Sequence, residues 1–330
     1  MPQNRPGRTG SGSIAADHTG GKGVAPTKRE RTRGGKPALP WFGFAGEAGL
    51  GMDAAMRASF IKMHGAGNDF VVFDERDQPL GLTPGLAVAL ADRHVGIGCD
   101  QLISIEPSAR ADALLRIRNA DGSEAEACGN ATRCVAALLA RQGATQHLAI
   151  ETGSGILAAE ILDADRVLVD MGEPLLLWNE IPLAKPLDTL ALPAGADWPG
   201  APAAVSMGNP HVTFFVPDAE AVEVGVLGPR IEHDPLFPAR ANVGFASILS
   251  PERLRLRVWE RGVGLTRACG SGASAALVNA NRLGLAGRKA DVVMDGGVLE
   301  IEWGPDGHVL MTGPAVISFR GEIDLDSFPR

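Results

Sequence analysis

Two cysteines that lie 141 residues apart share the same local sequence, and this internal repeat constrains the fold more than any other feature of the chain. Cys128 is followed by Gly129-Asn130 and an apolar run, and Cys269 is followed by Gly270-Ser271 and a second apolar run. In both places the cysteine stands where a turn containing glycine opens a predicted helix. Self-similarity of this kind indicates a duplicated architecture, so we interpret the chain as two related halves.

The same spacing aligns further positions without a gap. The aligned pairs are Gly67-Asn68 with Gly208-Asn209, Gln101 with Asn242, Arg116-Ile117 with Arg257-Val258, Asn119 with Glu260, and Gly143 with Gly284. After the second pair of glycines we expect the spacing to shorten by one residue, so that Met171 corresponds to Met311. Chance in a chain rich in glycine and alanine would not align the asparagine and glutamine positions.

Composition places the chain among soluble globular proteins. A length of 330 residues, with 45% hydrophobic and 21% charged residues, is typical of about two domains with a proper core. No apolar run approaches the roughly 18 residues of a membrane span, so we expect no membrane partner. A net charge of −8 argues against a nucleic-acid partner. Four cysteines are too few for a disulfide framework, which predicts free thiols in the reducing cytoplasm.

Residues 1–56 differ from the rest of the chain. They are basic, rich in glycine and proline, and without apolar periodicity, so we predict a disordered extension that carries none of the function. No apolar segment typical of a secretory signal occurs in it. Two alternatives stay open: an organelle transit peptide, or a start codon assigned upstream of the true start at Met52 or Met56.

The remaining pattern predicts an α+β fold. Each half contains short strands and one central apolar helix, which starts at the cysteine and ends at Gly143 or Gly284 as C-cap. We expect two pseudo-symmetric barrel-like β domains, each wrapped around its central helix, with the active site in the cleft between them. The predicted domains are 57–173 together with the C-terminal 315–330, and 174–314. The predicted elements of the first half are strands at 60–63, 70–73, 102–105 and 114–118, a turn at 65–69, and a helix at 83–94.

The position of the two cysteines suggests acid–base chemistry. A helix N-terminus lowers a thiol's pKa and offers unpaired backbone N–H groups to a carboxylate. Two such cysteines facing one ligand fit inversion at the carbon next to a carboxylate, with one thiolate removing the proton and the other thiol returning one. Fixed dipoles in a dry site would stabilise the negative charge that develops. We expect no cofactor and no metal, because neither a pyridoxal-phosphate lysine environment nor a metal cluster is evident.

Other uses of these residues are possible. Cys128 and Cys269 could be small buried hydrophobic residues, as most lone cysteines are, and we interpret Cys99 and Cys134 in that way. A hydrolase with a cysteine nucleophile is a further alternative, and its base would be one of three histidines, namely His64, His94 and His211. That alternative does not explain why the cysteine is duplicated.

The motifs resemble the diaminopimelate epimerase family over about residues 60 to 328. The matching segments are Lys62-Met63-His64-Gly65-Ala66-Gly67-Asn68-Asp69-Phe70, Gly98-Cys99-Asp100-Gln101, Asn119 through Asn130, Gly208-Asn209-Pro210-His211, Trp259-Glu260-Arg261-Gly262 and Ala268-Cys269-Gly270-Ser271-Gly272. The resemblance implies a cofactor-independent isomerase that interconverts LL- and meso-2,6-diaminopimelate in lysine and peptidoglycan precursor biosynthesis. It also implies a homodimer.

The resemblance implies roles for individual residues. Cys128 and Cys269 would be the two bases, with His211 beside them biasing their protonation. The residues that would hold the reacting carboxylate are Gly129, Asn130, Gly270 and Ser271. Glu260 would bind the reacting amino group, with the backbone of Arg261. The residues that would bind the distal end of the substrate are Asn68, Gln101, Asn119, Asn209, Asn242 and Arg261.

The chain departs from the family pattern at Ala131, where the family usually has glycine. We expect activity to survive, provided that the φ angle there is negative. Two other functions remain open. A proline or hydroxyproline racemase shares the fold and both cysteines, but typically has a histidine where this chain has Asn130. The chain could also be a catalytically retired module that binds a small molecule.

Overall fold

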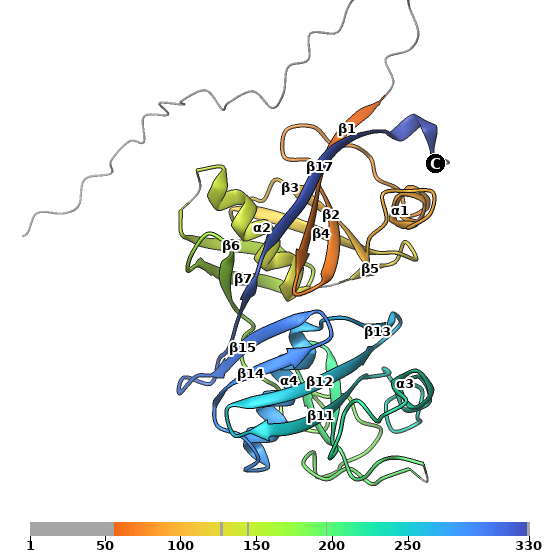
Figure 1. Ribbon diagram of the computed structural model, residues 1–330, viewed down its shortest axis with the longest axis vertical. Coiled ribbons are helices and arrows are strands. Elements are labelled where there is room, and N and C mark those ends of the chain that lie inside the picture. The colour runs from red at the N-terminus through yellow and green to blue at the C-terminus, as the bar shows by residue number, and fades with distance from the viewer. Residues whose placement is uncertain (1–55, 126–127, 144, 196, 329–330) are drawn as a thin grey trace, which may run out of the picture. The chain divides into compact units, whose positions relative to one another are not determined.

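The computed structural model describes residues 56–328 apart from 126–127, 144 and 196, and these residues belong to one compact unit. The predicted extension lies outside the described residues except for Met56. Within the described part, seventeen strands form one hydrogen-bonded sheet, and four α-helices accompany them (Figure 1).

The elements fall into two groups in chain order. The first half contains β1 (Arg57–Gly65), β2 (Asn68–Asp74), α1 (Pro84–Ala91), β3 (Gln101–Glu106), β4 (Ala113–Asn119), β5 (Glu124–Ala125), α2 (Gly129–Arg141), β6 (His147–Thr152), β7 (Gly155–Ile161) and β8 (Arg166–Asp170). The second half contains β9 (Ala203–Ser206), β10 (Pro210–Phe215), α3 (Val224–Glu232), β11 (Asn242–Ser250), β12 (Arg253–Glu260), β13 (Gly264–Thr266), α4 (Gly270–Arg282), β14 (Lys289–Met294), β15 (Gly297–Trp303) and β16 (Val309–Pro314). The chain ends with β17 (Val316–Asp324) and a 3-10 helix at Leu325–Ser327.

The strand pairing of the first half recurs in the second. β2 and β3 pair in parallel with Phe70 opposite Gln101, and β10 and β11 pair in parallel with His211 opposite Asn242. The parallel pairing of β4 with β6 likewise recurs between β12 and β14. Helices α2 and α4 begin and end at positions related by the spacing of the two cysteines. The predicted repeat is therefore confirmed.

The predicted change of spacing after the helices is wrong in direction. Ala159 lies opposite Val169 in the β7–β8 pair, and Ile301 lies opposite Met311 in the β15–β16 pair. Met311 therefore corresponds to Val169 and not to Met171. The spacing lengthens because the connection from α4 to β14 is one residue longer than the connection from α2 to β6.

Helices α2 and α4 are the predicted central helices. All residues of α2 from 129 to 139 are buried, and α4 is buried from 272 to 280. The C-caps are Gln142 and Leu283, one residue before the glycines that were expected to cap these helices. Gly143 and Gly284 follow with φ angles of 97° and 72°, because the residue after the C-cap takes the left-handed conformation that favours glycine.

The shorter predicted elements are largely confirmed. The four predicted strands of the first half lie within β1, β2, β3 and β4. The predicted turn shortens to Ala66-Gly67, because β2 already begins at Asn68. Helix α1 starts after the N-cap Thr83 but ends at Ala91, three residues early. It ends there because the backbone of Asp92 leaves the helical region with ψ of 127° and its carboxylate accepts hydrogen bonds from the turn that follows.

Two strand pairings join the halves. β16 pairs antiparallel with β8, which places Met311 opposite Val169. β17 pairs antiparallel with β1, which places Asp324 opposite Arg57, and Figure 1 shows it running alongside β1. The last strand of the chain thus completes the sheet of the first half.

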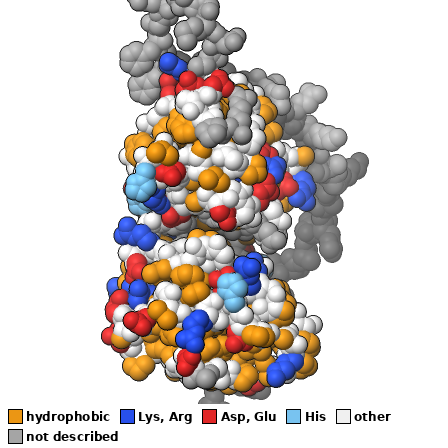
Figure 2. All heavy atoms as spheres, turned by 90° about the vertical axis from the view of Figure 1, so that its right-hand side faces the viewer, with side chains coloured by type: hydrophobic (Ala, Val, Ile, Leu, Met, Phe, Trp, Pro, Cys, Tyr) orange, Lys and Arg blue, Asp and Glu red, His pale blue; other side chains and the backbone are white. Residues whose placement is uncertain are grey.

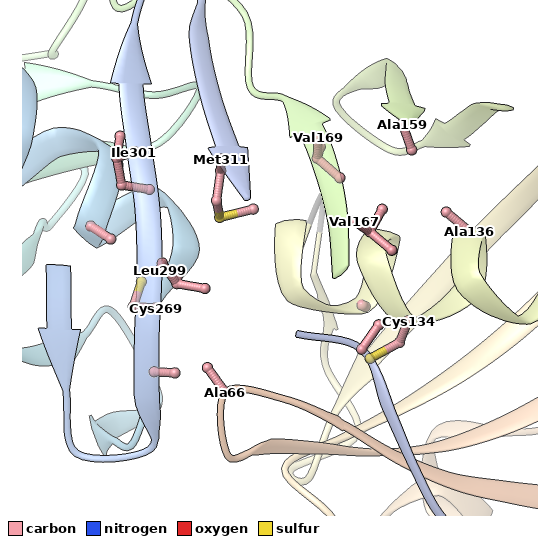
Figure 3. Close-up of a cluster of buried hydrophobic side chains, with 14 of the residues drawn as sticks. Ala66, Cys134, Ala136, Ala159, Val167, Val169, Cys269, Leu299, Ile301 and Met311 are labelled. Atoms are coloured by element: carbon pink, nitrogen blue, oxygen red, sulfur yellow. The ribbon is translucent and has the colours of Figure 1, made fainter. Parts of the chain in front are cut away.

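One hydrophobic cluster spans both halves. It includes Val167 and Val169 of β8 together with Leu299 and Ile301 of β15, and all four side chains are buried. Figure 3 shows Met311 between the strands that carry these two pairs. The largest cluster is therefore continuous across the two halves, which ties their stability together.

The face drawn in Figure 2 carries acidic and basic side chains interspersed with hydrophobic ones. Exposed ion pairs, such as that of Arg253 with Asp291, contribute only about 0–1 kcal/mol each. In the described part of the chain, no helix is long and apolar enough to cross a membrane.

The contact of Gly296 with the Ala66-Gly67 turn gives a stability prediction. A Cβ added to Gly296 would lie 1.9 Å from the carbonyl oxygen of Ala66. Because that obstacle is backbone, we expect Gly296→Ala to lower the free energy of unfolding by about 2–3 kcal/mol, measured by urea denaturation. Gly287→Ala is the matched control, since its Cβ would meet nothing closer than 3.7 Å. Equal destabilisation of the two variants would contradict the prediction.

Candidate active site

Both repeated cysteines cap their helices. Cys128 precedes α2 with extended backbone, and its half-buried thiol donates a hydrogen bond to Asn68 Oδ1 at 3.8 Å. Cys269 precedes α4, and its buried Sγ accepts a hydrogen bond from the backbone N–H of Gly272 at 3.3 Å. A second contact joins this Sγ to Ser271 Oγ at 3.7 Å. The predicted position of the cysteines at helix N-termini is confirmed.

The two helix N-termini lie close together. A Cβ added to Gly129 would lie 2.6 Å from Met311 Cε, and one added to Gly270 would lie 2.7 Å from Met311 Sδ. Asn130 Nδ2 donates to the carbonyl oxygen of Ala268 at 3.2 Å, which links the start of α2 to the residue before Cys269. The glycines therefore allow both helices to approach one methionine side chain.

A partly buried carboxyl group affects the pKa of both thiols. Glu260 ends β12, and its carboxylate accepts a hydrogen bond from Thr266 Oγ1. Burial raises the pKa of Glu260, and the hydrogen bond from Thr266 opposes that shift. The Glu260 charge in turn contributes to the raised pKa of Cys128 and of Cys269. Two thiols and one carboxyl group from separate parts of the chain thus influence one another.

The expected lowering of the thiol pKa values is wrong. Burial raises the pKa of Cys128 to about 11, although the N–H groups of Asn130 and Ala131 at the helix start lower it. Burial also raises the pKa of Cys269 well above its usual value. Desolvation of the thiolate outweighs the helix dipole, so both thiols are protonated at neutral pH.

The raised thiol pKa values predict a loss of stability in alkali. Burial raises the pKa of Cys99 and of Cys134 to about 12, from an ordinary 9.0. Between pH 9 and 12 the unfolded chain releases these protons while the folded protein retains them, so stability falls as pH rises. We expect the Tm to fall over this range, and the Cys99→Ala/Cys134→Ala double variant to show a smaller fall. The chain has no tyrosine to add a competing titration. Identical pH profiles for the two proteins would contradict the prediction.

The predicted distal-binding residues of the first half lie at neighbouring strand ends. Asn68 begins β2, and its Nδ2 donates to Asp100 Oδ2 at 2.9 Å. Gln101 begins β3 and donates through Nε2 to Asn119 Oδ1 on β4 at 2.9 Å. The other side-chain atom of this amide, Gln101 Oε1, is buried without a hydrogen-bond partner among the described residues. An unpaired buried acceptor beside asparagines fits a position that meets a ligand donor.

The corresponding residues of the second half are also held by hydrogen bonds. Asn209 donates through Nδ2 to Ser271 Oγ at 3.4 Å, and its Oδ1 contacts His211 Nε2 at 3.0 Å. Asn242 Oδ1 accepts from the backbone N–H of Arg261 at 2.9 Å. These bonds connect both predicted asparagines of the second half to residues within two positions of Cys269 or Glu260.

His211 is buried, and burial together with the charge of Arg261 lowers its pKa to about 3. The ring is therefore neutral at physiological pH. Among the described residues, the side-chain partners of Cys128 and Cys269 are Asn68, Ser271 and Glu260, and none is a histidine. This geometry weighs against the hydrolase alternative, and the role of His211 beside the thiols stays a prediction.

Cys99 and Cys134 are buried free thiols in the hydrophobic cores, as predicted for structural residues. Ala131 lies within α2 and is absent from the residues with positive φ, so alanine fits there without strain.

The sequence interpretation missed several residues that support the site. Three of them make hydrogen bonds to predicted site residues: Asp100 to Asn68, Arg133 to Asn130, and Thr266 to Glu260. Met311 lies between the two helix starts. Glu232 accepts hydrogen bonds from Trp259 Nε1 and from the N–H of Gly262. The sequence does indicate Arg133, since it is a charged residue within the apolar part of the helix, three residues after Asn130. The sequence does not indicate a role for Thr266 or Met311, because no pattern in it relates them to the cysteines.

Comparison with known proteins identifies the family of this chain. The family model of diaminopimelate epimerase matches residues 60–177 and 203–318. A diaminopimelate epimerase from Acidiphilium cryptum is 59% identical over 265 residues, which cover 80% of this chain and 96% of that protein. One from Rhodospirillum centenum is 53% identical over 272 residues, with 82% and 94% covered. The chain therefore belongs to the diaminopimelate epimerase family.

Solved structures share the fold at low identity. A probable proline racemase from Agrobacterium radiobacter K84 has a TM-score of 0.61 and 18% identity, over 82% of this chain and 94% of that chain. A hydroxyproline epimerase from Agrobacterium vitis also has a TM-score of 0.61, at 17% identity over 83% and 94%. These likenesses show a mixed fold of α-helices and β-strands, rich in strands with few helices.

Proposed function

We propose that this chain is a cofactor-independent isomerase that interconverts LL- and meso-2,6-diaminopimelate. One observation carries the proposal: the two repeated cysteines cap adjacent helix N-termini, and one partly buried carboxyl group raises the pKa of both thiols. The high identity to diaminopimelate epimerases supports the substrate. The reaction serves lysine and peptidoglycan precursor biosynthesis.

Each thiol carries out one of the two proton transfers. One cysteine, as thiolate, takes the α-proton and becomes a thiol, while the electron pair of the broken C–H bond passes into the carboxylate. The other cysteine gives its proton to the opposite face of the carbon and becomes a thiolate. Backbone N–H groups of Gly129 and Asn130, together with those of Gly270 and Ser271, hold the carboxylate and stabilise its added charge. Cys128 and Cys269 exchange these roles in the reverse direction.

The raised pKa values make substrate binding part of the mechanism. Glu260, with the backbone of Arg261, binds the reacting ammonium group. That positive charge offsets the Glu260 carboxylate, which contributes to the raised pKa of both thiols. Binding therefore lowers the free energy needed to form a thiolate at neutral pH.

The distal amino acid end meets polar side chains of both halves. Asn68, Gln101 and Asn119 come from the first half, and Asn209, Asn242 and Arg261 come from the second. The site thus lies in a cleft between two barrel-like domains, each wrapped around its central helix. The hydrogen bond from Asn130 to Ala268 supports this arrangement.

The cellular compartment and the oligomeric state also belong to the proposal. The enzyme is a cytoplasmic homodimer that needs no cofactor. Four free cysteines support a reducing compartment. His211 stays neutral and biases the protonation of the thiols through Asn209 and Ser271, which connect it to Cys269.

The test is to incubate the reduced protein with LL-diaminopimelate in deuterated water and follow meso product and α-deuterium together. Formation of deuterated meso-diaminopimelate supports the proposal. Turnover of proline or hydroxyproline instead would mean that the substrate is that of the racemases, whose fold the chain shares. Binding of diaminopimelate without turnover would leave a retired binding module.

A further inference from the structure

Arg133 is a fully buried cation. Its side chain is 0% exposed, and burial lowers its pKa to about 10, so it is still charged at neutral pH. Two glycines leave room for the guanidinium: a Cβ on Gly65 would lie 3.0 Å from Nη2, and a Cβ on Gly313 would lie 3.1 Å from Cζ. In the part of the chain that the structure describes, no carboxylate forms a salt bridge with it. A buried charge without a counterion destabilises a fold, so packing alone does not explain it.

The guanidinium is aimed at the start of α2. Nη2 donates to Asn130 Oδ1 at 2.8 Å, and Nη1 contacts Met311 Sδ at 3.1 Å. The third contact is from Nε to the carbonyl oxygen of Pro314 at 3.4 Å. Arg133 therefore touches the methionine between the two helix N-termini and the first polar side chain of α2.

The bond to Asn130 fixes the orientation of its amide. Because Oδ1 faces the guanidinium, Nδ2 faces the opposite side, where it donates to Asn68 Oδ1 at 3.1 Å and to the Ala268 carbonyl at 3.2 Å. Asn68 Oδ1 also accepts from the Cys128 thiol. One guanidinium thus fixes the orientation of the Asn130 amide, which is hydrogen-bonded to residues beside both cysteines.

The positive charge of Arg133 also favours negative charge at the start of α2. Arg133 is one of the groups that lower the pKa of Cys128, against the larger effect of burial. A cation behind a helix N-terminus adds to the positive potential of the backbone N–H groups. Its missing counterion is consistent with an anion that is present only during the reaction.

We propose that Arg133 is a positioning residue, which orients the Asn130 amide between the two cysteine-bearing segments and stabilises negative charge at the start of α2. The inference rests on the proposed function for its consequence in catalysis. Its effect on the Cys128 thiol is independent of any substrate.

Three variants test it: Arg133→Met, Arg133→Lys, and the matched control Arg141→Met. Arg141 lies at the exposed C-terminal end of the same helix, paired with Asp165. For each protein, the rate of Cys128 alkylation by iodoacetamide is measured against pH by mass spectrometry, alongside the kcat and KM for LL-diaminopimelate. Thermal unfolding establishes the folded fraction, to which all rates are normalised.

Arg133→Met is expected to shift the alkylation profile to higher pH by up to about one pH unit, because a nearby positive charge is lost. Its kcat/KM should fall about a hundredfold, mainly through kcat, because the amide is no longer held. Arg133→Lys should keep the alkylation profile but lose about tenfold in kcat/KM, since an ammonium lacks the planar fork. Arg141→Met should match the wild type in both measurements.

An unshifted alkylation profile in Arg133→Met would overturn the proposal, as would equal shifts in the methionine and lysine variants. Activity losses that disappear on normalisation to folded protein would also overturn it, because they would reveal a purely structural role. If the wild type fails to epimerise diaminopimelate, the proposed function fails, while the alkylation profiles still decide the role of Arg133.

Discussion

Replacing either Cys128 or Cys269 by alanine is expected to lower the kcat for epimerisation by at least about a thousandfold, since each thiol supplies one of the two proton transfers. A variant that retains one thiol still has a base on one face of the substrate. We therefore expect it to exchange the α-proton of at most one epimer with deuterated water, without inversion. Measuring deuterium uptake separately from LL- and meso-diaminopimelate would show which cysteine faces which epimer.

Cys99→Ala and Cys134→Ala are the controls for this prediction. Both residues are buried free thiols that pack in the hydrophobic cores, so their loss should change stability more than turnover. Epimerisation that continues at a tenth of the wild-type rate in Cys128→Ala or Cys269→Ala would contradict the two-thiol mechanism. Complete exchange from both epimers in one variant would mean that the missing cysteine is not a base.

Glu260→Gln is expected to lower kcat/KM by about 10²–10³-fold, because a neutral amide does not compensate the charge of the substrate ammonium group. The same substitution removes a negative charge that contributes to the raised pKa of both thiols. Alkylation of Cys128 should therefore shift to lower pH while epimerisation falls. This shift is opposite in direction to that expected for Arg133→Met.

The matched control is Glu252→Gln, an exposed carboxylate in the same half of the chain. It should leave both the kinetics and the alkylation profile unchanged. If Glu260→Gln raised the pH needed for alkylation, the inferred electrostatic influence of Glu260 on Cys128 would be wrong. If it altered neither measurement, Glu260 would not belong to the site.

The two halves and their central helices were predictable because the internal repeat marks the same positions in each half. The spacing of Cys128 and Cys269 predicted where both central helices begin and, to within one residue, where they end. Neighbouring residues in the sequence determine where such helices start and end. Residues at helix starts and strand ends are recognisable from their neighbours alone.

The electrostatics of the site were not predictable in the same way. A helix N-terminus was expected to lower the pKa of Cys128, but the pKa is raised because the surrounding chain removes water from the thiol. The contact of Met311 with both helix starts arises from a strand far along the chain. Desolvation and contacts between distant segments depend on the whole fold, and a local sequence pattern does not contain them.

The return of β17 to β1 has a consequence for biosynthesis. β1 is the first described strand, and its partner β17 follows all the other described strands in the chain. During synthesis, one long edge of β1 therefore stays unpaired until β17 has been made, and an unpaired edge is open to wrong pairing. β2 covers the other edge at once, since it follows β1 through a two-residue turn. A chain that stops before Val316 thus exposes a strand edge that the folded protein covers.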